Sequence, residues 1–157
     1  MPTDLQTAAT KLFREAFEGR PEGAGGTWFV QDREAILPTL DAVDAMAASH
    51  SPGSGLPSLA AHAYHLRYIL QWTNVPEGDT RPEGDWESTW AKEVVTSEEW
   101  DALRAEIRER FDRAVAWMAR NEDWSVEDAP TTFLAGLPHV AYHLGAMRVI
   151  LKLVEGP

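Results

Sequence analysis

The spacing of apolar residues constrains the fold of this chain more than any other feature. Between residues 97 and 120 they recur at steps of three and four, at Trp100, Leu103, Ile107, Phe111, Ala114 and Met118. Side chains with this spacing share one face of an α-helix, which predicts a long helix with its apolar stripe facing a core. Thr96 and Glu99 have the spacing of a capping box, which predicts that the helix begins near residue 97.

The same period predicts further helical segments. They cover residues 4–18, 32–49, 57–73 and 138–154, with a start near Phe133 as an alternative for the last. Pro38 is expected to divide the second segment into two pieces. Pro57 and Pro138 are expected in the first turns of the segments that they begin. No strand pattern of comparable strength occurs, so we predict an all-α protein.

The length of the chain and the number of its helices predict one helical bundle. At 157 residues, the chain is expected to form a single domain, residues 1–157, with its own core. Four of these segments are the main amphipathic helices, residues 4–18, 57–73, 97–120 and 138–154. Together they predict a four-helix bundle. A long acidic connection, residues 75–96, joins the second and third of them and carries Trp86 and Trp90. Long connections are often functional, although anchoring of the loop to the core by its tryptophans is the simpler interpretation.

Composition excludes several classes of function. The net charge is −11, from 14 basic and 25 acidic residues, so nucleic acids and anionic membrane surfaces are not expected as partners. Cysteine is absent, which excludes disulfides, thiolate metal sites and cysteine nucleophiles and fits a cytoplasmic location. No apolar stretch reaches the roughly 20 residues of a membrane span, and the N-terminus has no apolar signal core.

Two histidine pairs are the strongest indication of chemistry. His139 and His143 are four residues apart and His62 and His65 are three apart, so each pair shares a helix face. Imidazole nitrogens bind zinc, nickel, iron and copper, and a third imidazole from a facing helix would complete a three-nitrogen site with open positions. The alternative is a set of buried histidines that hydrogen-bond within the core. The fifth histidine, His50, lies in a polar turn and is expected to be solvated.

The residues around the histidines narrow the chemistry. Val140 stands where a zinc peptidase of the His-Glu-x-x-His type has its glutamate base, so that mechanism is excluded. No histidine of the two pairs follows a glutamate by three residues, which excludes a ferritin-like di-iron site. A first-turn position for His139 would place it at the positive end of the helix dipole, which favours the neutral, metal-binding form.

Three segments resemble the DinB-like (damage-inducible) superfamily of four-helix metalloproteins. They are SLAAHAYHLRYIL in the second main helix, DWESTWAKEVVTSEEWDALR before and within the third, and LPHVAYHLGAMRVIL in the fourth. The resemblance covers about residues 28–153. It implies a DinB-like bundle in which one histidine of the second helix and two of the fourth bind a divalent metal.

The resemblance also assigns the ligands. In that superfamily the second-helix ligand commonly follows a Ser or Thr by about seven residues and precedes an aliphatic residue, which matches Ser58, His65 and Leu66. It therefore implies His65, His139 and His143 as the metal ligands and His62 as a neighbouring, outer-shell group. The glutamine that often follows the second histidine of the fourth helix is missing here.

The resemblance implies a divalent-metal-dependent enzyme with a small-molecule substrate. The reaction is expected to be S-transfer from a low-molecular-weight thiol or metal-assisted hydrolysis, with zinc or nickel as the metal and iron or manganese as alternatives. Tyr68 and Trp72 follow His65 on the same helix face and are candidates for a pocket wall, although core packing is the simpler role. A non-catalytic bundle that binds a metal or small molecule, as a monomer or homodimer, is the alternative function.

Overall fold

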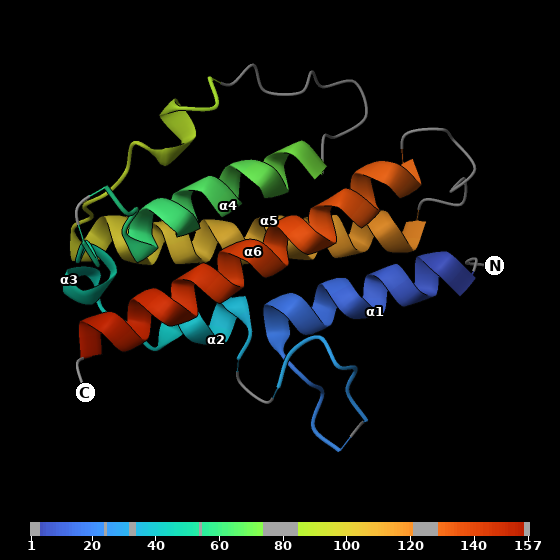
Figure 1. The fold of residues 1–157 in the computed structure, drawn as a ribbon. Helices are drawn as coiled ribbons and strands as arrows, with labels where there is room; N and C mark the ends of the chain where they lie inside the picture. Colours follow the sequence, from blue (N-terminus) through green and yellow to red (C-terminus); the bar gives the residue numbers. More distant parts are fainter. Residues whose placement is uncertain are drawn as a thin grey trace.

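In a computed structural model, the protein is described over residues 4–23, 25–31, 34–53, 55–73, 85–120 and 129–155. These residues are all-α, and no strand occurs among them (Figure 1). The helices are α1 (Asp4–Glu18), α2 (Ile36–Asp41), α3 (Ala45–Ala48), α4 (Leu59–Thr73), α5 (Ser97–Arg120) and α6 (Ala129–Glu155), with a 3₁₀ turn, η1 (Ser88–Trp90), between α4 and α5. In the described part of the chain, no helix combines the length and the apolar character of a membrane span.

The four long helices pack side by side. Helix α4 contacts both α5 and α6, and α1 also contacts both α5 and α6. The short helix α2 packs against α1, α5 and α6, while α3 packs against α4 and α5 (Figure 1). The contact between α4 and α6 positions the candidate site, because these two helices carry the two histidine pairs.

The core is built from the apolar stripes of these helices. All six residues of the stripe predicted for residues 97–120 are buried, which confirms that prediction. Phe111 of this stripe stacks on Phe13 and Phe17 of α1, with ring centroids 5.6 and 4.9 Å apart. Buried aromatic rings of this kind exclude a large apolar area from water and dominate core energetics. They join α1 to α5 in the core.

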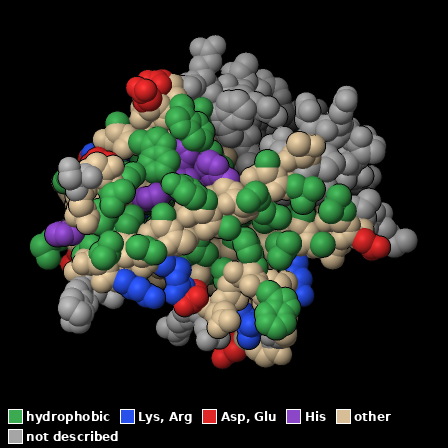
Figure 2. All heavy atoms as spheres, in the orientation of Figure 1, with side chains coloured by type: hydrophobic (Ala, Val, Ile, Leu, Met, Phe, Trp, Pro, Cys, Tyr) green, Lys and Arg blue, Asp and Glu red, His purple; other side chains and the backbone are tan. Residues whose placement is uncertain are grey.

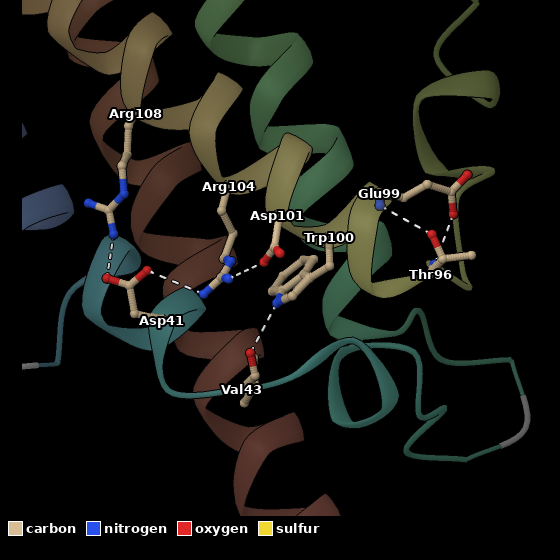
Figure 3. Close-up of polar contacts among 8 residues, drawn as sticks. All are labelled: Asp41, Val43, Thr96, Glu99, Trp100, Asp101, Arg104 and Arg108. Carbon is tan, nitrogen blue, oxygen red and sulfur yellow. Dashed lines mark hydrogen bonds and ion pairs between the residues drawn. The ribbon is translucent and has the colours of Figure 1, made fainter.

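The start of α5 has the predicted capping box. The backbone N–H of Thr96 donates to Oε2 of Glu99 at 2.9 Å, and the N–H of Glu99 donates to Oγ1 of Thr96 at 3.2 Å (Figure 3). These two bonds satisfy backbone donors that have no partner within the helix. They explain why α5 begins at Ser97, as predicted.

Polar contacts also join α5 to the segment that follows α2. The indole N–H of the buried Trp100 donates to the carbonyl oxygen of Val43 at 3.0 Å (Figure 3). Asp41 at the end of α2 pairs with Arg104 and Arg108 of α5. The ion pairs lie at the surface and contribute little to stability, whereas the indole bond satisfies a buried donor.

Three helix boundaries differ from the predictions, and each involves a proline. The segment predicted for residues 32–49 is divided after Ala42, where Asp44 caps α3, and Pro38 lies inside the first turn of α2, where its missing N–H costs nothing. Helix α4 begins at Leu59, and Oγ of Ser58 accepts the N–H of Ala61 at 3.1 Å, so Pro57 precedes the helix.

The third difference concerns α6, which begins at Ala129, before both the predicted start at Pro138 and the alternative near Phe133. Pro138 is therefore in the helix interior, where it removes one backbone hydrogen bond. The residue lies on an exposed face, so the carbonyl group that loses its partner can bind water. The predicted first-turn position of His139 is wrong, and with it the predicted effect of the helix dipole.

Candidate metal centre

Three histidines converge between α4 and α6. One ring nitrogen each of His65, His139 and His143 lies within 4.8 Å of the other two, close enough to bind one metal ion. Nε2 of His139 is 3.2 Å from Nε2 of His65 and 3.0 Å from Nε2 of His143. These separations compare with the ~3.3 Å between two ligand nitrogens around a tetrahedral zinc with Zn–N distances of about 2.0–2.1 Å.

The position of each histidine follows from the packing of the two helices. His65 is fully buried on the α4 face that meets α6. His139 and His143, one helical turn apart, share the α6 face that meets α4. His139 is only partly buried and is the outermost of the three. The 3.6-residue repeat thus aligns the α6 pair, and helix packing adds the α4 histidine.

The Nδ1 atoms of His65 and His143 point away from the other triad nitrogens, and both have partners. Nδ1 of His65 lies 2.7 Å from Oγ1 of Thr89 in the turn η1. Nδ1 of His143 lies 2.9 Å from Nδ1 of His62, which is itself buried. A partner on the far nitrogen orients a metal-binding imidazole. His62 therefore contacts a member of the triad through a nitrogen that faces away from the centre.

Burial keeps the histidines of this cluster neutral. Loss of hydration lowers the pKa of His65 and of His62 to about 4 and that of His143 to about 2. Repulsion between neighbouring imidazolium rings adds to the effect on His65 and His143. Burial also lowers the pKa of His139, in place of the helix dipole that the sequence suggested. Neutral imidazoles at pH 7 are the form that binds metals.

Aromatic rings from the segment before α5 cover the histidines. Trp90 stacks on the ring of His65 with centroids 4.2 Å apart and an interplanar angle of 18°, and Trp86 meets the same ring edge-on at 4.6 Å. Trp86 is 54 % exposed, so it does not anchor the loop in the core as the simpler interpretation held. Trp90 is partly buried and packs on the buried ring of His65, so both tryptophans belong to the surroundings of the site and Trp90 also holds the loop against α4.

The site reaches the molecular surface. Figure 2 shows histidine side chains at the surface with hydrophobic side chains around them. Tyr142, which is 65 % exposed, meets the ring of His143 edge-on at 5.2 Å. Trp86 also lies edge-on to His139, with centroids 6.1 Å apart. A small molecule that approaches the outermost histidine would meet exposed aromatic rings.

The remaining predicted site residues have different outcomes. Tyr68 is partly buried with its ring centroid 6.4 Å from that of His65, which places it beside the cluster. The side chain of Trp72 lies outside the described residues. His50 is exposed, as expected for a polar turn. Sequence reasoning missed Thr89 and Tyr142, and nothing in their local pattern distinguishes them from ordinary loop and helix residues.

Comparison of the chain with models of known protein families, with curated proteins and with solved structures finds no match. The resemblance to the DinB-like superfamily therefore stays a prediction. What is shown is a class of site: three neighbouring histidines in an all-α protein, close enough to bind a metal ion.

Proposed function

We propose that this protein is a divalent-metal-dependent enzyme with a four-helix bundle of DinB-like topology. The four long helices α1, α4, α5 and α6 would form the bundle, and their mutual contacts support this arrangement. His65, His139 and His143 would hold the metal, with zinc or nickel as the first choices. The observation that carries the proposal is the convergence of three histidines from two helices that are far apart in the sequence, with Nε2 of His139 lying 3.2 Å from that of His65 and 3.0 Å from that of His143.

The residues that surround the triad support a catalytic role over a purely structural one. Three imidazoles leave coordination positions free, and a divalent ion with free positions lowers the pKa of a water or thiol that binds to it. His139 is partly exposed, so solvent reaches the side of the triad that it occupies. Thr89 and His62 hold the inner rings from behind, as outer-shell partners do in metal enzymes.

Transfer of a low-molecular-weight thiol to an electrophilic small molecule is the reaction that we favour. The thiol would give up its proton to solvent, and its sulfur would form a bond to carbon while the leaving group departs with the electron pair of the broken bond. The chain has no cysteine, so the sulfur must come from a cosubstrate. Trp86, Trp90 and Tyr142 support this choice, because sulfur makes favourable contacts with aromatic rings. The cytoplasmic location expected from the sequence stays a prediction.

Cobalt substitution tests the proposal directly. Metal-free protein without an affinity tag is titrated with Co²⁺, and its visible absorption reports coordination. The His143→Ala variant should lose this spectrum, while His50→Ala removes an exposed histidine and should keep it. Addition of 2-mercaptoethanol to the cobalt form should produce a sulfur-to-metal charge-transfer band.

Each outcome of the titration selects one function. A cobalt spectrum that thiol leaves unchanged but azide alters would replace thiol transfer with metal-assisted hydrolysis. A spectrum that neither ligand alters would support the non-catalytic alternative. Absence of any cobalt spectrum in the wild-type protein would overturn the metal site itself.

A further inference from the structure

The turn η1 places a buried hydroxyl group against one candidate metal ligand. Thr89 is only 4 % exposed, and its Oγ1 lies 2.7 Å from Nδ1 of His65. The same Oγ1 lies 2.6 Å from the carbonyl oxygen of Trp86, one turn earlier in the loop. A single hydroxyl group thus stands between an imidazole nitrogen and a backbone carbonyl.

This arrangement determines where the proton of His65 resides. A carbonyl oxygen only accepts hydrogen bonds, so the hydroxyl hydrogen of Thr89 must point at Trp86. The oxygen of Thr89 then has only lone pairs for His65, and Nδ1 of His65 must carry the proton. A neutral imidazole has one N–H, so Nε2 of His65 presents a lone pair to the triad.

The other outer-shell contact leaves this choice open. The pair of Nδ1 atoms of His62 and His143 shares one proton between them, and either ring can donate it. The tautomer of His143 is therefore free to change. The tautomer of His65 is imposed, because the hydroxyl group of Thr89 donates to Trp86 and can only accept from His65. Among the partners described, Thr89 is the one that imposes a metal-binding tautomer.

The rest of the loop holds Thr89 in place. The ring of Trp90 stacks on His65. The backbone N–H of Trp90 donates to the carbonyl oxygen of Glu87 at 3.1 Å, which closes the turn. Further along, Glu93 accepts from the N–H and hydroxyl of Ser58, through its side chain at 2.8 Å and its carbonyl at 2.7 Å. The described residues around η1 are thus fastened to the start of α4 and to the ligand that α4 carries.

We propose that Thr89 is a positioning residue that holds His65 in the metal-binding tautomer, so that metal affinity depends on the docking of η1. The proposal rests on the proposed function for the role of His65, but the tautomer itself is a property of the metal-free protein. The turn η1 thereby becomes part of the metal site without supplying a ligand.

Nitrogen-15 NMR of the metal-free protein tests the tautomer. Ring-proton to nitrogen correlations at pH 7 distinguish Nδ1–H from Nε2–H, and the His65→Ala variant assigns the signals. Wild-type protein and Thr89→Ser should show His65 as the Nδ1–H form. Thr89→Val has nearly the same shape without the hydroxyl, and His65 should then populate both forms. Ser88→Ala removes a hydroxyl from the same turn that donates to Asp85, and should leave His65 unchanged.

Zinc affinity tests the consequence. Thr89→Val should weaken zinc binding roughly 10–100-fold, the usual effect of losing an outer-shell partner. Thr89→Ser and Ser88→Ala should bind as the wild type does, and circular dichroism checks that each variant is folded. An Nε2–H form of His65 in the wild-type protein, or wild-type affinity in folded Thr89→Val, would overturn this inference. Failure of the wild-type protein to bind zinc would overturn the proposed function instead, while the NMR result would still decide the tautomer.

Discussion

The buried histidine cluster should make the metal-free protein unusually sensitive to mild acid. His62, His65 and His143 have pKa values of about 4, 4 and 2 in the folded protein, against 6.5 for an ordinary histidine. Between pH 6.5 and about 4 the unfolded chain binds protons at these positions and the folded protein does not. Folding stability is therefore complete above pH 6.5 and is lost as the pH falls below it.

The magnitude follows from the same values. A histidine with a pKa of 6.5 when unfolded, and of about 4 or less when folded, loses about 2 kcal/mol of stability between pH 7 and pH 5. Three such groups together lose about 5–6 kcal/mol, and the lowered pKa of His139 acts in the same direction. The total stability of a domain of this size is about 5–15 kcal/mol, so the loss is a large part of it.

Urea denaturation followed by tryptophan fluorescence measures this loss. The seven tryptophans of the chain report unfolding, and linear extrapolation gives the free energy of unfolding at pH 7, 6 and 5 in the presence of a chelator. The pKa values of Glu99 and Glu106 are lowered from 4.5, so these carboxylates act mainly below the chosen range.

Two variants separate the cluster from other acid effects. His143→Asn should reduce the loss between pH 7 and pH 5 by about 2 kcal/mol, because one buried histidine no longer titrates on unfolding. His50→Asn removes an exposed histidine and should leave the pH dependence unchanged. A free energy of unfolding that stays constant from pH 7 to pH 5 in the wild-type protein would refute the reasoning. It would mean that the clustered histidines bind protons as readily in the folded protein as in the unfolded chain.

Three further predictions follow from particular contacts. His62→Ala should weaken zinc binding roughly 10–100-fold, because His143 loses its partner. His62→Asn keeps an acceptor near the position of Nδ1 and should recover most of the loss. Equal zinc affinities for the wild type and both variants in isothermal titration would contradict this role. Thr96→Ala removes the cap of α5 and should lower the free energy of urea unfolding by about 1 kcal/mol, whereas an unchanged midpoint would show that the cap is dispensable. Trp100→Phe leaves the carbonyl of Val43 without its indole donor and should lower the thermal midpoint by several degrees, at a cost of about 1–3 kcal/mol, which calorimetry can measure and an unchanged midpoint would disprove.

Local patterns predicted a helix correctly where the residues that form its boundary signal lie within a few positions of one another. The bounds of α1 and α5 agree with the predictions, and in α5 both partners of the capping box are three residues apart. The helix boundaries predicted from prolines were wrong because a proline can have several roles. One proline lies in the first turn of α2, one precedes α4 and one lies inside α6. Which role applies depends on what surrounds the helix and not on the proline itself.

The sequence by itself determined that the protein is helical and that two helices each carry a pair of histidines on one face, because both properties follow from the 3.6-residue repeat. Tertiary structure decided which nitrogens meet. His65 lies 74 residues from His139 and 24 from Thr89, and His62 lies 81 from His143. Contacts across such separations depend on how α4, α6 and the loop dock. The same docking removes water from the rings and brings them together, and this burial, with the repulsion between neighbouring rings, lowers the pKa values of His65 and His143.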